Sequence, residues 1–212
     1  GRHVLITAGP TREPIDPVRY ISNHSSGKQG YAIAAAAVKL GAQVSLISGP
    51  VSLPIPPGAG MTPVTTAQEM LKAVEKSLPA DIAIFTAAVA DWRVDHVAVE
   101  KLKKRDDGTP PALQFAENPD ILKTIAALKK GRPKLVVGFA AETESVVDHA
   151  KAKLAKKGCD LIVANDVSAE NNVFGGDANT VHLVSKAGVE NWPRLSKDEV
   201  AARLMQTLAG ML

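Results

Sequence analysis

Short apolar runs alternate along the chain with segments of helical spacing. The runs are rich in β-branched residues and nearly continuous in hydrophobicity, which is typical of strands buried on both faces and therefore parallel. This alternation predicts an α/β fold, a doubly wound and mostly parallel sheet with helices on both sides. We expect strands at Val4–Ala8, Val44–Ser48, Ile82–Thr86, Leu135–Phe139 and Leu161–Ala164, and helices at Ser26–Leu40, Ala67–Ser77, Pro119–Lys129, Glu144–Lys157 and Lys197–Leu208.

The stretch at about 92–116 interrupts this alternation. It has no helical period, and it carries a charged, turn-rich run from Lys101 to Pro111 before a strand expected at Ala112–Phe115. A connection of this length inside a domain is typical of a functional loop or of a disordered segment. The sequence therefore predicts an excursion from the sheet at this point.

The C-terminal part is predicted to close the sheet. An alternating run at Thr180–Val184 and a turn at Lys186–Gly188 form the pattern of an edge hairpin, and a capping helix follows. The whole chain, residues 1–212, is predicted to be a single Rossmann-like domain with one excursion and one edge hairpin.

Composition indicates a globular protein without a polyanionic partner. Of 212 residues, 45% are hydrophobic and 22% charged, which is enough to bury a full core. The net charge is only +3 and aromatic residues make up 4%, so stacking surfaces for nucleic acid are scarce. The apolar runs are far shorter than the ~20 residues that span a bilayer. We expect no nucleic acid and no membrane among the partners.

Cys159 is the one cysteine in the sequence. It has no partner for an intramolecular disulfide, and no Cys/His cluster is present to hold zinc, which fits a reducing, cytoplasmic compartment. Its place just before an apolar run favours a small buried side chain over a nucleophile. No leader is visible, and because Gly1 stands almost directly before the first strand, the chain is expected to be a piece of a longer protein.

Ligands of open parallel sheets bind where the strands end, so the polar residues after each apolar run are the candidates. The first run ends in a small-residue turn at Gly9, whose backbone amides can face an anion. The following helix is preceded by Ser25 and Ser26, which can cap it, while Gly27 and Gly30 allow a phosphate to approach its positive end. From spacing alone, a phosphate site and a structural role for these glycines both stay open.

Two familiar phosphate motifs are absent at this turn. The nucleotide-kinase loop would need glycine where Ser22 stands and a hydroxyl residue where Gln29 stands. The dinucleotide fingerprint would need an acid at the end of the second strand, which instead ends in Ser48-Gly49-Pro50. These departures count against a nicotinamide-dependent dehydrogenase.

The residues Ile6–Ala34, ITAGPTREPIDPVRYISNHSSGKQGYAIA, closely resemble those of bacterial phosphopantothenoylcysteine synthetases. The resemblance covers nearly the whole chain, and several long motifs in one order are far more specific than a single glycine pattern. These motifs are AAVADWR at 87–93, EKLKK at 100–104, NPDIL at 118–122, VGFAAET at 137–143 and ANDVS at 164–168.

The resemblance implies a ligase of coenzyme A biosynthesis. CTP would activate the carboxylate of 4′-phosphopantothenate as an acyl-cytidylate with loss of pyrophosphate, and the amine of L-cysteine would then form the amide and release CMP. Mg²⁺ is the implied cofactor. The resemblance also implies a homodimer, with the excursion as lid and pairing segment, and fusion to an N-terminal flavin-dependent decarboxylase.

The resemblance further implies which residues form the site. Asn23, Lys101 and Arg19 are expected to be catalytic, and Asn23, Arg19, Ala88 and Lys104 to bind the substrate. The expected nucleotide-binding residues are Gly9, Ser25, Ser26, Gly27, Phe85, Thr86, Ala87, Asp91, Lys101, Pro119, Asp120, Ile121, Leu122, Phe139, Lys153 and Lys157.

Several of these positions have an ordinary structural interpretation as well. Lys153 and Lys157 stand four apart, as on a solvated helix face, although the resemblance places both near the nucleotide. Asn23 can serve a turn, or its amide can hold the reacting carboxylate. Asp91 can cap a turn, or it can bind the cytidine or the metal. Lys101 belongs either to a flexible charged loop or to a lid that excludes water from the intermediate.

Lys28 adds one more cation near the first helix. A non-enzymatic alternative, a nucleotide-binding regulatory module, would bind CTP without releasing pyrophosphate. The basic excursion and the polar strand ends favour turnover over that alternative.

Overall fold

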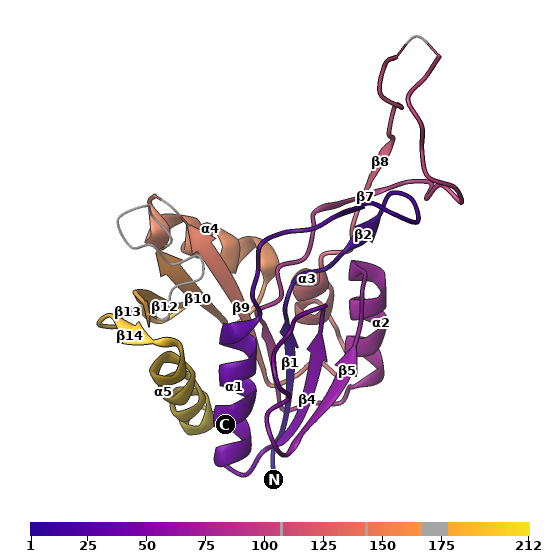
Figure 1. Ribbon diagram of the computed structural model, residues 1–212. Coiled ribbons are helices and arrows are strands. Elements are labelled where there is room, and N and C mark those ends of the chain that lie inside the picture. Colours follow the sequence, from indigo (N-terminus) through magenta and orange to yellow (C-terminus); the bar gives the residue numbers. More distant parts are fainter. Residues whose placement is uncertain (107, 143, 167–177) are drawn as a thin grey trace.

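A computed structural model describes residues 1–106, 108–142, 144–166 and 178–212 (Figure 1). Its centre is an eight-stranded sheet. In spatial order its strands are β13 (Gly188–Asn191), β12 (Val181–Ser185), β10 (Leu161–Asp166), β9 (Leu135–Glu142), β6 (Ile82–Phe85), β1 (His3–Ala8), β4 (Gln43–Ser48) and β5 (Ala59–Pro63). The strands from β10 to β5 pair in parallel, and β12 and β13 are antiparallel. The predicted doubly wound, mostly parallel sheet with an edge hairpin is confirmed.

Helices cover both faces of this sheet. On one face lie α1 (Lys28–Lys39) and α5 (Lys197–Gly210), and on the other lie α2 (Ala67–Lys76), α3 (Ile121–Ala126) and α4 (Val146–Lys157) (Figure 1). Neighbouring residues of one strand point to opposite faces, so Ile6 belongs to the core under α1 whereas Leu5 belongs to the core under α2. This double burial explains why the strands are apolar without alternation.

One strand of the sheet, β5, was not predicted from the sequence. β5 is an edge strand whose residues Ala59-Gly-Met-Thr-Pro63 are half-buried or exposed, so it needs no apolar run. Its place is set by parallel backbone pairing with β4. Helix α3 is also shorter than predicted: it ends at Ala126, and it begins only at Ile121 because the Asp120 side chain caps it by accepting a hydrogen bond from the Lys123 amide at 3.0 Å.

The prediction that Ser25 and Ser26 cap α1 is wrong. The helix begins after Gly27, which is its N-cap with φ of 76°, and no side chain caps it. Because this left-handed residue turns the chain into the helix, the two hydroxyls lie too early to reach the usual second and third amides. They accept long hydrogen bonds from the amides of Gly27 and Lys28 instead, at 3.4 and 3.5 Å.

The predicted excursion is an arm, residues 92–117, that projects away from the sheet (Figure 1). Its base is an antiparallel pair, β7 (Trp92–Val94) and β8 (Phe115–Glu117), so the strand expected at Ala112–Phe115 lies later than predicted. A small hairpin, β2 (Glu13–Pro14) with β3 (Tyr20–Ile21), lies beside the arm.

The C-terminal helix α5 starts with a capping box formed by Ser196 and Glu199 and packs against α1. Before it, β11 (Ala178–Asn179) pairs with β14 (Leu195–Ser196). Among the described residues, no helix has the length and apolar character needed to cross a bilayer.

Gly30 allows the first turn of α1 to approach the sheet. A Cβ at this position would lie 2.5 Å from the Ala8 Cβ and 2.5 Å from the Thr86 Oγ1. We expect Gly30→Ala to lower the free energy of unfolding by about 1–3 kcal/mol, because the helix must move away from the strand ends. Urea denaturation measures this change. Gly210→Ala in α5, where a Cβ meets open space, is the matched control and should be neutral or stabilising by up to ~1 kcal/mol. Equal stability of the two variants would contradict the close approach.

Candidate active site at the strand ends

Two adjoining cavities lie at the carboxyl ends of the central strands, where an open parallel sheet binds its ligands. Cavity I has a volume of about 430 Å³ and lies between the base of the arm and helices α3 and α4. Cavity II has a volume of about 470 Å³ and lies at the start of α1. They share the wall residues Ala87, Val89, Phe139 and Lys153. A ligand that fills both would therefore pass beside Lys153.

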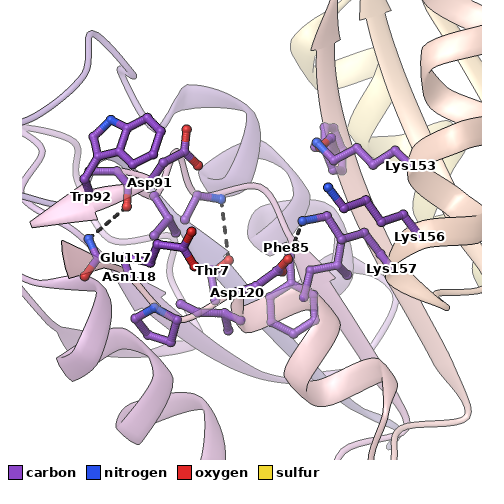
Figure 2. A pocket seen from close by; sticks show the side chains of 17 residues that line it. Thr7, Phe85, Asp91, Trp92, Glu117, Asn118, Asp120, Lys153, Lys156 and Lys157 are labelled. Carbon is purple, nitrogen blue, oxygen red and sulfur yellow. Dashed lines mark hydrogen bonds and ion pairs between the residues drawn. The ribbon is translucent and has the colours of Figure 1, made fainter. Parts of the chain in front are cut away.

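Cavity I brings together predicted residues from four separate segments. Figure 2 shows lysines of α4 on one side and Asp91 with Trp92 on the other. The predicted residues that line it are Phe85, Ala87, Asp91, Pro119, Asp120, Ile121, Leu122, Phe139, Lys153 and Lys157.

Lys153 and Lys157 both turn toward cavity I from one face of α4, but their charges are compensated differently. Lys157 forms an ion pair with Asp120. Lys153 donates to a neutral acceptor, the Phe139 carbonyl, at 2.8 Å. Burial lowers the pKa of Lys153, and the neighbouring charge of Lys157 lowers it further. An anion in the cavity would stabilise the charged form of Lys153.

Asn118 ties the two loops that border cavity I. Its side chain donates to the Ala90 carbonyl at 2.8 Å, and its backbone amide donates to the Asp91 carbonyl at 2.9 Å. Its Oδ1 is shielded from solvent and accepts no hydrogen bond in the described part of the chain. Sequence reasoning quoted this residue in a motif but assigned it no role.

Cavity II gathers the loop before α1 and the ends of three strands. Lys28 and Lys197 supply cations beside Lys153 at its wall. This is the composition of an anion site at the start of a helix. The predicted residues that line it are Asn23, Ser25, Ser26, Gly27, Lys28, Thr86, Ala87, Ala88, Phe139 and Lys153.

Asn23 holds the loop before α1 against the strand end. Its Nδ2 donates to the Ala88 carbonyl at 2.6 Å, while its Oδ1 accepts from the Ser25 amide at 3.1 Å. The turn role and the ligand role considered from the sequence are thus compatible, because the amide is fixed at the wall of cavity II.

Asn165 is a candidate that sequence reasoning missed. It lies near the end of β10 and lines cavity II. Its Oδ1 is shielded from solvent and finds no hydrogen-bond partner among the described residues. The signal was present in the sequence, because a polar side chain that follows the apolar run Leu161–Ala164 marks a strand end.

The other predicted residues do not line either cavity. Gly9 lies behind the wall, where the Cβ of a residue replacing Gly27 would come within 3.4 Å of its Cα. Arg19 forms an ion pair with Asp16 at 2.5 Å near the base of the arm. Lys101 and Lys104 belong to the arm itself. Thr143, Val167 and Ser168 of the quoted motifs lie outside the described residues.

The residues do not form a metal cage. In the described ranges, no group of three His, Cys, Asp or Glu side chains is placed to hold a metal ion. Asp91 is exposed at the rim of cavity I. This donor set fits an ion that takes one carboxylate from the protein and its other ligands from phosphates and water, as Mg²⁺ commonly does.

Cys159 is buried with 1% exposure, and burial raises the pKa of its thiol. A buried thiol with a raised pKa is a poor nucleophile, so the prediction of a structural cysteine is confirmed. Trp192 is buried in the core. Trp92, in contrast, is 55% exposed and lines cavity I.

Fold and site together define an α/β domain with a cation-rich, two-part binding site at its strand ends, suited to a phosphorylated ligand. The family model described as "DNA/pantothenate metabolism flavoprotein C-terminal domain" matches residues 1–211, and the chain belongs to this family. This confirms the resemblance to phosphopantothenoylcysteine synthetase domains.

Individual relatives support the same assignment. The coenzyme A biosynthesis bifunctional protein CoaBC of Vibrio cholerae is 48% identical over 209 residues, which are 98% of this chain and 52% of that protein. CoaBC of Escherichia coli K12 is 51% identical over 205 residues, which are 96% of this chain and 50% of that protein. The chain therefore spans about half the length of these relatives.

A solved structure covers the matching half. The crystal structure of the C-terminal domain of a coenzyme A biosynthesis bifunctional protein CoaBC superposes with a TM-score of 0.83 at 42% identity. The match covers 100% of this chain and 95% of that chain. The arrangement of sheet and helices is thus that of a known C-terminal domain.

Lys157 compensates the charge of Asp120 at the edge of cavity I. Burial acts to raise the pKa of Asp120, but the hydrogen bond from Lys157 and the Lys123 amide outweigh it, and the net pKa is lowered. We expect Lys157→Met to raise the pKa of Asp120, measured by carbon NMR titration of the carboxyl group. Lys156→Met is the matched control, since Lys156 lines the same cavity but lies outside the Asp120 ion pair. An Asp120 pKa that is unchanged in Lys157→Met would contradict this pairing.

Proposed function

We propose that the chain is a phosphopantothenate–cysteine ligase domain of coenzyme A biosynthesis. CTP activates the carboxylate of 4′-phosphopantothenate as an acyl-cytidylate, and L-cysteine then forms the amide. The observation that carries this proposal is the joining of two cavities beside Lys153, in a chain related over its whole length to the C-terminal half of CoaBC proteins.

The cavities fit the two charged substrates. Cavity I takes the cytidine, with Phe85 and Phe139 beside it and loop backbone around residue 120 at its edge. Cavity II takes phosphates at the start of α1, beside Lys28. The reacting carboxylate then meets the α-phosphate near Ala87 of the shared wall and the neighbouring Ala88 of cavity II.

The chemistry needs no covalent group on the protein. In the first step, a carboxylate oxygen forms a bond to the α-phosphorus and the bond from that phosphorus to the pyrophosphate oxygen breaks. In the second step, the amine nitrogen of cysteine bonds to the acyl carbon, the bond to CMP breaks, and the amine loses a proton. The cations around Lys153 stabilise negative charge on the leaving pyrophosphate.

Asn23 is suited to hold the reacting carboxylate. As a neutral amide, it can hydrogen-bond an anion without neutralising it, so the carboxylate keeps its nucleophilic charge. One N–H of its Nδ2 is donated to the Ala88 carbonyl at 2.6 Å, and the second N–H can be donated to a substrate oxygen near Ala88.

Mg²⁺ is part of this proposal as an ion that arrives with CTP. Asp91 is the residue that would hold the ion. The positive charge of Mg²⁺ would offset the negative charge of the triphosphate.

Lys101 and Lys104 serve the site as part of a lid, since both lie on the arm and outside the open cavities. Closure would exclude water and protect the acyl-cytidylate from hydrolysis. Arg19 joins the substrate site only through movement of this region or through a second copy of the chain.

A homodimer is part of the proposal, supported by the apolar surface of the arm. Val99 is 91% exposed, Phe115 57% and Trp92 55%, and Val18 and Tyr20 of the adjoining β2–β3 hairpin are also exposed. Large apolar side chains gathered on one projection mark an interaction surface.

We also propose a cytoplasmic location and, because the relatives are bifunctional proteins, fusion to a decarboxylase.

Pyrophosphate release tests the function. With phosphopantothenate and each of the four nucleoside triphosphates in turn, we expect release with CTP and, when L-cysteine is added, formation of phosphopantothenoylcysteine. Binding of CTP without pyrophosphate release would favour the regulatory-module alternative. A change in nicotinamide absorbance would favour the dehydrogenase.

Variants of Asn23 and Lys101 separate the two half-reactions. We expect Asn23→Asp and Lys101→Gln to retain CTP binding and some pyrophosphate release, while amide formation falls by about one to two decades, the effect of losing a charge-assisted hydrogen bond. Quenched-flow chromatography should show accumulated acyl-cytidylate. Asn191→Asp, in the edge hairpin, is the control and should match the wild type. Equal losses in both half-reactions would remove these two residues from their proposed roles.

Light scattering tests the dimer. We expect a particle of twice the 22.2 kDa chain mass at micromolar concentration. Val99→Asp should weaken the association at least tenfold, because it would bury a charge at an apolar contact. Ile55→Asp, at an exposed apolar residue outside the arm, is the control and should leave the mass unchanged. A wild-type particle of 22.2 kDa would contradict pairing.

A further inference from the structure

Asp16 is a buried carboxylate in the turn between β2 and β3, outside both cavities. Its two oxygens have separate tasks. Oδ1 accepts hydrogen bonds from the amides of Val18 and Arg19, both at 2.8 Å, which shape the local turn. Oδ2 accepts from the Arg19 guanidinium at 2.9 and 2.5 Å and from the Leu102 amide at 3.1 Å. One oxygen thus serves the turn and the other connects it to the arm.

The connection holds the arm through both backbone groups of Leu102, its amide and its carbonyl. While Asp16 accepts from the Leu102 amide, Arg19 donates to the Leu102 carbonyl at 2.9 Å. A second tie lies a few residues earlier, where the Ala98 amide donates to the Ile15 carbonyl at 3.0 Å. The peptide group between Lys101 and Leu102 is therefore fixed against the β2–β3 hairpin.

Beyond Leu102 the arm is held differently. Its described tip is organised by its own turn, in which the Arg105 amide donates to the Thr109 carbonyl at 2.9 Å and the Gly108 amide to the Arg105 carbonyl at 2.8 Å. These bonds stay within the tip and do not connect it to the sheet. The arm thus has an anchored base that ends at Leu102 and a tip that begins directly after it.

The anchor is charged under ordinary conditions. The Arg19 guanidinium holds the pKa of Asp16 well below its usual range, and the amides of Val18, Leu102 and Arg19 act in the same direction against the opposing effect of burial. The carboxylate is therefore available as an acceptor throughout the neutral range.

We propose that Asp16 is a positioning residue that anchors the arm at Leu102 and thereby sets the point from which the Lys101 side chain reaches the site. The anchoring rests on the contacts above, whereas its effect on catalysis rests on the proposed ligase function. Arg19 acts in the same anchor as the second clamp on Leu102.

Asp16→Asn is the informative variant because it separates the two oxygens. The asparagine Oδ1 can still accept from the amides of Val18 and Arg19, so the turn is preserved. Its Nδ2 is a donor and faces two other donors, the Arg19 guanidinium and the Leu102 amide, so the connection to the arm is lost. Glu190→Gln, which removes an exposed ion pair with Arg203 far from the arm, is the matched control.

Limited trypsin digestion tests, without any substrate, whether Asp16 holds the arm at Leu102. In the wild type we expect cleavage after Lys103 and Lys104 of the tip to be much faster than cleavage after Lys101. Asp16→Asn should speed cleavage after Lys101 about tenfold or more, as local opening becomes easier, and Glu190→Gln should not. Light scattering verifies that all variants keep the wild-type mass. Unchanged cleavage after Lys101 in Asp16→Asn would overturn the anchor.

Hydrogen exchange of the wild-type chain gives a second measurement that needs no variant. We expect the Leu102 amide to exchange at least about tenfold more slowly than the amides of Lys103 and Lys104. If Leu102 exchanges as fast as these two, the anchor is absent in solution and the proposal is wrong.

A double-mutant cycle tests the link to catalysis. If Asp16 acts through Lys101, Asp16→Asn should lower the rate of amide formation about tenfold in the wild-type background, with KM for CTP unchanged, and should have no effect in the Lys101→Gln background. Effects that multiply would show that Asp16 does not act through Lys101. A wild-type chain that makes no amide would refute the ligase function. Trypsin digestion and hydrogen exchange would still show whether Asp16 anchors the arm.

Discussion

The approach of helix α1 to the sheet at Gly30 is the contact on which the site depends. With no side chain at this position, the first turn of α1 rests directly on Ala8 of β1 and Thr86 after β6. Thr86 in turn donates to the Thr7 carbonyl at 2.7 Å, so the ends of β1 and β6 are joined beneath the helix. The start of α1 therefore opens onto the strand ends, and cavity II forms between them. A larger residue would separate the helix from the strands and thereby change the shape of cavity II.

Charge at the strand ends is left partly uncompensated, and this explains how a phosphorylated ligand would be favoured. Lys157 forms an ion pair with Asp120, whereas Lys153 donates its hydrogen bond to a neutral group, the Phe139 carbonyl. Keeping a lysine charged in a half-buried place costs free energy, as the lowered pKa of Lys153 shows. An anion between the two cavities would offset that cost. Because Lys153 lies at the wall that both cavities share, its charge can act on a ligand in either of them.

Sequence patterns predicted the parts of the structure whose position follows from burial. The double-sided strands, the main helices and the edge hairpin have the expected hydrophobic periodicity, whereas most of the predicted residues around both cavities came from the family resemblance. What could not be predicted depends on backbone pairing or on distant contacts. β5 has no apolar run because it lies at an edge, and the capping prediction for Ser25 failed because Gly27 adopts a left-handed conformation. The unpaired oxygen of Asn165 becomes visible only when the neighbouring strands are in place.

The arm shows most clearly why a list of site residues does not describe the site. Arg19 has the charge expected of a phosphate-binding residue, yet in the structure this charge meets Asp16, and the pair holds the backbone of Leu102, 83 residues further along the chain. This polar tie supplements the little apolar packing of the arm, because Val94 at its base is buried whereas Val99 and Phe115 are exposed. An arm held by backbone hydrogen bonds at its base keeps those side chains available for another surface. The anchor that we propose for Asp16 thus uses polar contacts to hold the base of the arm, and it leaves the exposed apolar side chains of the arm available for the pairing that we also propose.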